Sequence, residues 1–153
     1  MPDYDNRKEE AAHASKARIG SVSSGTMRAE DLVPAFMSVL RELSPDHKLL
    51  TADVDDQDEE ELDDLVVSLF DALEEFAPPY CYFGAHPGDG SDYGFWVWDD
   101  IQQQMDPDTS LIVEDTAQVP ADFVGEVLLV SDHGNMTLFN ADRGALTEVW
   151  SIV

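Results

Sequence analysis

The sequence predicts an α+β fold, with two N-terminal helices packed on one face of an antiparallel sheet of about five strands that ends in a C-terminal meander. Apolar residues recur at helical spacing up to residue 76. After residue 79, short aromatic and β-branched runs alternate with glycine-rich turns, which is typical of antiparallel strands. The length of 153 residues suits one domain with a core of its own.

We expect residues 1–25 to form a flexible, mildly basic tail and residues 26–153 to form a single acidic α+β domain. Residues 1–28 hold five basic and four acidic side chains, and the stretch SVSSGT (21–26) has the composition of a linker. Two interpretations of the tail stay open. It is either a solvated segment or a segment that folds back on the acidic body or onto a partner.

The first helix is predicted to run from residue 26 or 31 to about residue 43, with Thr26 or Asp31 as its cap. Pro34 has no backbone N–H, so we expect it in the first turn or at a break in the helix. The inward positions are Leu32, Phe36, Val39 or Leu40, and Leu43.

The second helix is the clearest element, because one apolar stripe runs along it. Acidic residues crowd its N-terminus, where the helix dipole favours negative charge, and Pro78 and Pro79 end it. The stripe consists of Leu62, Leu65, Val66, Leu69, Phe70, Leu73 and Phe76.

Strands are expected at residues 80–83 and 93–98, joined by a glycine-rich loop over residues 84–94. Residues 99–104 are expected to form one helical turn, and residues 111–113 a short apolar run. The meander is predicted from three apolar runs separated by the hairpin turns SDHGN and NADRG, with strands at 126–130, 136–139 and 148–153.

The charge distribution limits the possible partners. Residues 49–142 carry 24 acidic side chains and no lysine or arginine, and the net charge of the chain is -25. Such a surface repels nucleic acid and anionic membranes and attracts basic proteins. Direct nucleic-acid binding is disfavoured because phosphate binding depends on lysine and arginine. The expected partner is therefore a basic protein, above all one that binds nucleic acid, whereas the oligomeric state is left open.

The acids of the second helix and of the segment before it form the candidate partner-binding site, which we call the acidic face. Nine of them span residues 58–75, a rise of about 26 Å along a helix, or about one charge per 3 Å. Phosphates along one DNA strand are about 3.4 Å apart. Six of the nine are bunched within residues 58–64, and an ordinary solvated helix surface is the alternative. The acidic face consists of Asp53, Asp55, Asp56, Asp58, Glu59, Glu60, Glu61, Asp63, Asp64, Asp71, Glu74 and Glu75.

Neither a metal nor a cofactor is expected. As a calcium loop, the run DVDDQDEEELDD (53–64) would need glycine at its sixth position and glutamate at its twelfth, where the chain has Asp58 and Asp64.

We do not expect an enzyme, although His86, Asp89 and His133 offer one candidate catalytic group. No motif with diagnostic spacing surrounds them, and no lysine or arginine stands nearby to stabilise an anionic transition state. Structural roles in turns are favoured for both histidines. Cys81 lies in an apolar run and is expected to be a small buried residue.

Strand alternation puts Trp96 and Trp98 on one face of the sheet and Phe95 and Val97 on the other. If the sheet is covered on one side only, one pair is exposed and forms a protein-binding patch. Packing in the core is the favoured alternative.

The single cysteine leaves no internal disulfide, and no apolar signal core or run of about 18–20 apolar residues is present. We therefore expect a soluble, cytoplasmic protein.

The phrases TMRAEDLVPAFM (26–37), PPYCYFGAHPGDGSDYGFW (78–96) and GEVLLVSDHGNMTLF (125–139) resemble small acidic, uncharacterised accessory proteins of phages and other mobile elements. The resemblance covers most of residues 26–153. It implies a host-directed role and brings no assigned activity and no catalytic residues.

Three functional hypotheses follow. The first is a DNA-mimicking inhibitor, of the anti-restriction or anti-CRISPR type, that occupies the nucleic-acid-binding surface of a host protein. The second is adaptation to high salt, since aspartate outnumbers glutamate 21 to 12 and only three lysines occur. The third is an immunity protein against a basic toxin nuclease, which would have the same electrostatics as the first.

Overall fold

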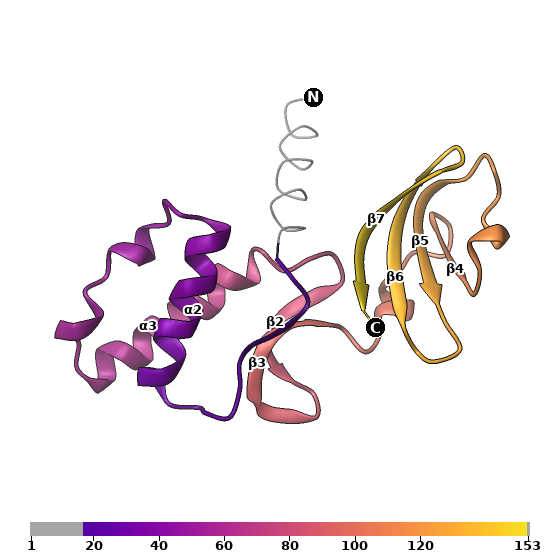
Figure 1. The fold of residues 1–153 in the computed structure, drawn as a ribbon. Helices are drawn as coiled ribbons and strands as arrows, with labels where there is room; N and C mark the ends of the chain where they lie inside the picture. Colours follow the sequence, from indigo (N-terminus) through magenta and orange to yellow (C-terminus); the bar gives the residue numbers. More distant parts are fainter. Residues whose placement is uncertain (1–16, 153) are drawn as a thin grey trace. The chain divides into compact units, whose positions relative to one another are not determined.

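The structure of the protein is a computed structural model that describes residues 17–152. These residues form two compact units, an N-terminal unit up to Val97 and a C-terminal unit from Trp98 onward (Figure 1). Each unit contains its own sheet, of three and four strands respectively. The α+β class is confirmed, whereas the expected single sheet of about five strands is wrong, because the described strands divide between two sheets.

The N-terminal unit combines two long helices with a three-stranded sheet. Its sheet has the order β1-β3-β2, and both strand pairs are antiparallel. The elements along the chain are β1 (Gly20–Ser23), α2 (Ala29–Leu43), the 3-10 turns η1 (Lys48–Thr51) and η2 (Val54–Asp56), α3 (Glu59–Glu74), β2 (Cys81–His86) and β3 (Asp89–Val97).

Strand β1 lies in a stretch that the sequence predicts as tail. It pairs with β3 at Gly94, where any Cβ atom would overlap the carbonyl oxygen of Gly20. The glycine on β3 therefore lets a polar segment add to the sheet, which the composition of that segment does not indicate. The remainder of the expected tail, residues 1–16, lies outside the described residues.

Helix α2 begins at Ala29, between the two expected cap positions, and continues through Pro34. Its N-cap residue is Arg28, whose side chain makes no capping hydrogen bond. The hydroxyl of Thr26 donates to Asp31 Oδ2 at 2.7 Å instead, so neither residue is the cap. Pro34 lies in the second turn, where the burial of Val33 and Phe36 offsets the hydrogen bond that proline cannot donate.

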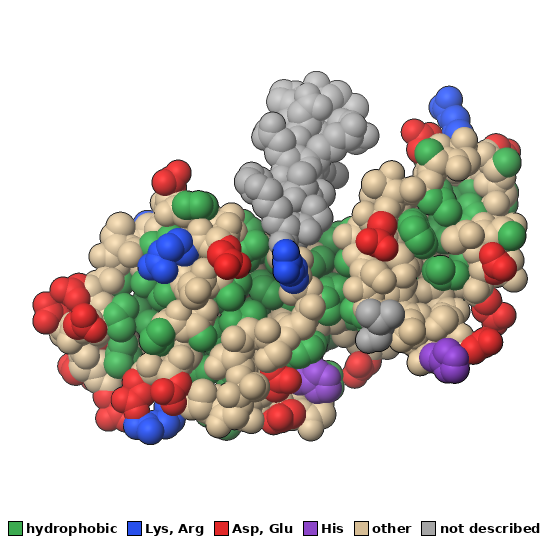
Figure 2. Space-filling view, in the orientation of Figure 1, with side chains coloured by type: hydrophobic (Ala, Val, Ile, Leu, Met, Phe, Trp, Pro, Cys, Tyr) green, Lys and Arg blue, Asp and Glu red, His purple; other side chains and the backbone are tan. Residues whose placement is uncertain are grey.

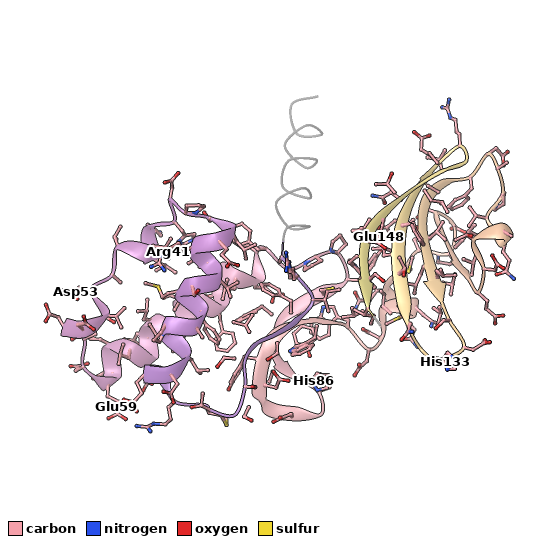
Figure 3. All side chains as sticks on the ribbon, viewed as in Figure 1. Arg41, Asp53, Glu59, His86, His133 and Glu148 are labelled. Carbon is pink, nitrogen blue, oxygen red and sulfur yellow. The ribbon has the colours of Figure 1, made fainter. Side chains whose placement is uncertain are left out.

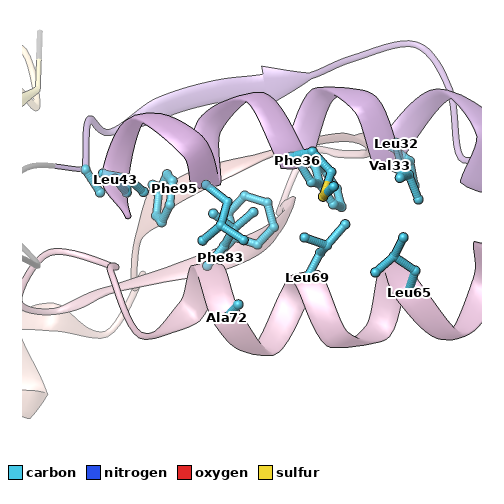
Figure 4. Packing of buried hydrophobic residues seen from close by; sticks show 13 residues of the cluster. Leu32, Val33, Phe36, Leu43, Leu65, Leu69, Ala72, Phe83 and Phe95 are labelled. Carbon is cyan, nitrogen blue, oxygen red and sulfur yellow. The ribbon is translucent and has the colours of Figure 1, made fainter. Parts of the chain in front are cut away.

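Helix α3 follows the predicted apolar stripe, with Leu65, Leu69 and Leu73 buried. Figure 4 shows α2 and α3 side by side and running in the same direction, with Leu32 beside Leu65. Parallel neighbours need a connection that returns along their length, and residues 44–58 with η1 and η2 provide it.

The two helices cover one face of the three-stranded sheet through an aromatic core. The ring of Phe36 lies 5.3 Å from that of Phe70 and 5.1 Å from that of Phe83, and Phe83 lies 4.9 Å from Phe95. Edge-to-face and tilted pairs of this kind add to the stabilisation that burial provides. The helix-on-sheet arrangement is therefore correct for the N-terminal unit.

The β2–β3 hairpin is tighter than predicted. Most of the expected glycine-rich loop is strand, because β2 extends to His86 and β3 begins at Asp89. Gly84 and Gly94 are opposite each other in the ladder rather than in a turn. Glycine is required at position 94 because the backbone of β1 comes close to it.

The C-terminal unit is a mixed sheet of order β4-β5-β6-β7. The predicted meander is present, but β4 pairs with β5 in parallel, so the expectation of a purely antiparallel sheet is wrong here. Val113, Val127 and Ala141 form the buried centre of one face. The elements are α4 (Ile101–Gln104), β4 (Ser110–Val113), η3 (Thr116–Gln118), β5 (Val124–Val130), β6 (Met136–Asp142) and β7 (Ala145–Ile152).

Between residues 17 and 152, no helix has both the length and the apolar character needed to cross a bilayer.

Candidate functional site

All twelve residues of the acidic face are exposed, and they lie on η2, on α3 or directly beside these elements. Asp53 precedes η2, Asp55 and Asp56 lie in it, and the other nine extend along α3. Figure 2 shows carboxylates gathered at the end of this unit where η2 and the start of α3 lie, and Figure 3 labels Asp53 and Glu59 there.

Four of the nine acids on α3 form a row opposite the apolar stripe. Glu60, Asp64, Asp71 and Glu75 occupy positions i, i+4, i+11 and i+15, so they share one side of the helix. The row is about 22 Å long, with gaps of about 6, 10 and 6 Å. Val67, with 61% of its surface exposed, lies beside the widest gap. The charges thus form an extended line with uneven spacing.

No base neutralises this line within the part of the chain that the structure describes. The two ion pairs found between residues 17 and 152 join Arg28 to Glu30 and Arg143 to Asp142, and neither involves the acidic face. Its carboxylates are therefore balanced by solvent and counterions, which a basic partner can displace.

Two members of the acidic face also stabilise the fold. Asp58 caps α3, since its Oδ1 accepts a 2.9 Å hydrogen bond from the backbone N–H of Glu61. Glu74 Oε2 accepts a 2.6 Å hydrogen bond from the backbone N–H of Phe83 on β2. Only the first role has a sequence signal, because an aspartate directly before an apolar periodic run is a common cap.

The candidate catalytic residues occupy different units. His86 and Asp89 are opposite each other at the tip of the β2–β3 hairpin, whereas His133 lies in the turn between β5 and β6 of the C-terminal unit. His86 Nδ1 accepts a 2.9 Å hydrogen bond from the backbone N–H of Gly88, and its ring packs edge-on against Trp96 at 4.7 Å. These contacts give His86 a structural role in the turn.

Asp89 is held by the same hairpin. Its Oδ1 accepts hydrogen bonds from the backbone N–H and the hydroxyl of Ser91, at 3.0 and 2.9 Å. These bonds, with a smaller contribution from His86, lower the pKa of Asp89 below its ordinary value. An ionised carboxylate fixed in this way suits a turn.

The structural roles of His86 and Asp89 do not test whether the protein is an enzyme, so the absence of catalysis stays a prediction.

Cys81 is buried at the start of β2, as the sequence predicts. Burial raises the pKa of its thiol from 9.0 to about 12, so the side chain is protonated at neutral pH and is a poor nucleophile. Among the described residues, no group of three or more histidine, cysteine, aspartate or glutamate side chains is arranged to hold a metal ion.

Trp96 and Trp98 do not form the pair on one face of the sheet that strand alternation predicts. Phe95 is buried in the core, and Trp96 is half-buried, with its Nε1 donating to the carbonyl of Gly84 at 3.0 Å. Trp98 has 43% of its surface exposed and follows the end of β3 at Val97, so it does not extend a strand face with Trp96.

No family model, no curated protein and no solved structure matches this chain. The resemblance to phage accessory proteins therefore stays a prediction that rests on the three sequence phrases.

Proposed function

We propose that this protein is a non-enzymatic inhibitor that binds the basic, nucleic-acid-binding surface of another protein in place of nucleic acid. The observation that carries the proposal is the acidic face, twelve exposed carboxylates on η2 and α3 with no ion pair to a base of residues 17–152. A protein that needed charge only for solubility would intersperse lysines among these acids.

The geometry supports mimicry of a phosphate backbone rather than of bases. The row on α3 offers four charges over about 22 Å, a length that six or seven phosphates of one DNA strand would span. Long arginine and lysine side chains can adjust to its uneven gaps. Complementary charge speeds the encounter of the two proteins, and the complex weakens as salt screens it.

The expected target is a host protein that handles nucleic acid, given the resemblance to phage-borne accessory proteins. An immunity protein bound to a basic toxin nuclease would use the same surface in the same way.

The proposal is tested by a tagged pull-down from host lysate at about 50 mM salt, repeated at about 0.5 M. The captured protein is then titrated with a variant that carries Glu60→Lys, Asp64→Lys, Asp71→Lys and Glu75→Lys. The control changes four exposed acids of the C-terminal unit to lysine, namely Asp99, Asp108, Asp122 and Asp132. Both variants alter the net charge equally.

We expect the α3 variant to lose at least about 100-fold in affinity, because four favourable charges become repulsive. Equal affinity of the wild type and the α3 variant would rule out binding through the acidic face. If the protein unfolds in dilute buffer and refolds in molar potassium chloride, salt adaptation explains the acidity instead.

A further inference from the structure

A groove of about 510 Å³ lies between the N-terminal ends of α2 and α3. Its apolar lining comes from Met27, Ala29 and Leu62, and its acidic lining comes from Glu30, Glu59 and Asp63. Both ends lie on the same side of the unit because the two helices run in the same direction (Figure 4). The groove is therefore a consequence of the parallel helix pair and of the chain that enters α2.

The charges of the groove are only partly balanced. Arg28 also lines it, but the guanidinium of Arg28 pairs with Glu30. Glu59 and Asp63 are exposed and take part in neither of the two ion pairs found within residues 17–152. The groove thus presents two carboxylates, together with the apolar side chains of Met27 and Leu62.

The apolar part of the groove is open to solvent. Met27 has 67% of its surface exposed, the largest exposed fraction among the big apolar side chains of residues 17–152. Leu62 is partly buried against the core of the unit. An occupant that covers Met27 and Leu62 while it approaches Glu59 and Asp63 needs an apolar stem and a cationic end.

We propose that this groove receives one arginine or lysine side chain of the basic protein partner, an inference that rests on the proposed function. The aliphatic stem packs on Met27 and Leu62, as long basic side chains do on apolar surfaces. The cationic end makes charge-assisted hydrogen bonds with Glu59 and Asp63. The positive N-terminal ends of α2 and α3 offset part of the carboxylate charge, so the groove suits one cation rather than several.

The volume agrees with this occupant. Pockets for small molecules measure about 300–1,000 Å³, and the groove falls in the lower half of that range. It accommodates a side chain with part of its backbone. The groove therefore adds one defined contact to a surface that otherwise acts through distributed charge.

The test compares two neutralised variants with equal change in charge. Glu59→Gln with Asp63→Asn removes the carboxylates of the groove, and Asp64→Asn with Asp71→Asn removes two acids that do not line it. The probe is an acetylated and amidated arginine hexapeptide, with a glutamine hexapeptide as the neutral control. Binding is followed at about 50 mM salt by NMR of methyl-labelled methionines, with Met136 of the C-terminal unit as internal reference.

We expect the arginine peptide to shift the Met27 methyl signal in a saturable way and the glutamine peptide to leave it unchanged. The groove variant should bind the arginine peptide about 5- to 10-fold more weakly than the matched variant. One result would contradict the groove proposal and leave the proposed function standing. In that result the arginine peptide binds, the two variants weaken its binding equally, and the Met27 methyl signal does not shift. If the arginine peptide does not bind at all, the groove proposal is also wrong, and the proposed function is then decided by the charge-reversal variant described above.

A further outcome would give the groove a different occupant. The N-terminal segment carries Arg7, Lys8 and Lys16. If changing these three residues to glutamine in the full chain shifts the Met27 signal without any peptide, the groove binds the chain's own basic segment, and the proposed partner contact is wrong.

Discussion

Glu74, near the C-terminal end of α3, accepts a 2.6 Å hydrogen bond from the backbone N–H of Phe83 on strand β2. Strand β2 is an edge of its sheet, and alternate N–H groups of an edge strand need a partner outside the sheet. One carboxylate therefore joins a helix to a sheet and satisfies an edge donor. Glu74 therefore stabilises the fold and is also one of the exposed carboxylates of the acidic face.

We predict that Glu74→Ala lowers the free energy of unfolding by about 1 kcal/mol, because the Phe83 N–H loses a charged acceptor that is partly screened by water. Glu75→Ala is the matched control, since Glu75 is an exposed neighbour for which no such bond is found. Urea denaturation followed by circular dichroism measures both. Equal stability of the two variants would show that the bond contributes nothing.

Gly94 is predicted to be essential for the pairing of β1 with β3. Gly94→Ala places a Cβ against the carbonyl of Gly20, so β1 must move away from the sheet. We expect faster hydrogen exchange at the amides of Ser21 and Ser23 and a loss of about 2 kcal/mol in stability. Gly90→Ala, on the same strand with open space around it, should have little effect on either quantity. Unchanged exchange in the Gly94 variant would contradict the close approach.

The helices could be predicted from the sequence better than the sheets. The spacing of Leu65, Leu69 and Leu73 determines which side of α3 is buried, because helical periodicity is a local property. The glycines were harder to interpret. Gly84 and Gly94 are typical turn residues in a sequence, yet both lie in strands, and Gly94 is required there because the backbone of β1 comes close to it.

The division into two sheets depends on pairing between distant residues. Strand β4 lies beside β5 in parallel, with Leu111 opposite Val127, and no local pattern indicates that register. The candidate site shows the same contrast. The exposure of the acids follows from their spacing on α3, whereas the contact of Glu74 with Phe83 depends on the fold of the unit.

Asp89 should titrate below its ordinary pKa of 3.8, because hydrogen bonds from Ser91 favour the ionised carboxylate. Since the folded pKa is lower than the unfolded one, the stabilisation is present above the unfolded pKa and is lost as pH falls through the folded value. NMR titration of the Asp89 side chain measures the midpoint. Ser91→Ala should raise it only part of the way toward the ordinary value, because this change removes the hydroxyl donor and keeps the backbone N–H donor. A midpoint that stays the same in that variant would exclude the Ser91 hydroxyl as a contributor.

The Cys81 thiol should react slowly with disulfide reagents in the folded protein at pH 8, because its pKa is about 12 and it is buried. The sign of the linked stability follows from the raised pKa. Folding stability is unaffected below the ordinary value of 9.0 and falls as pH rises from there toward 12, since the unfolded chain ionises first. Cys81→Ala should remove this alkaline loss, although it also leaves a small cavity. A thiol that reacts as fast when folded as in urea would contradict its burial.

The row of acids on α3 should cost the protein stability at low salt. Glu60 with Asp64, and Asp71 with Glu75, are like-charged pairs four residues apart, and each such pair destabilises a helix by about 0.2–0.5 kcal/mol. Asp64→Lys with Glu75→Lys places a lysine four residues after an acid in both pairs, which is the favourable order. We predict that this variant is about 1 kcal/mol more stable at low salt, that the gain shrinks in about 0.5 M salt, and that affinity for the basic partner we propose falls. Thermal unfolding at both salt concentrations and a binding titration measure these effects. If the variant gains stability and still binds as tightly as the wild type, Asp64 and Glu75 do not contribute to partner binding.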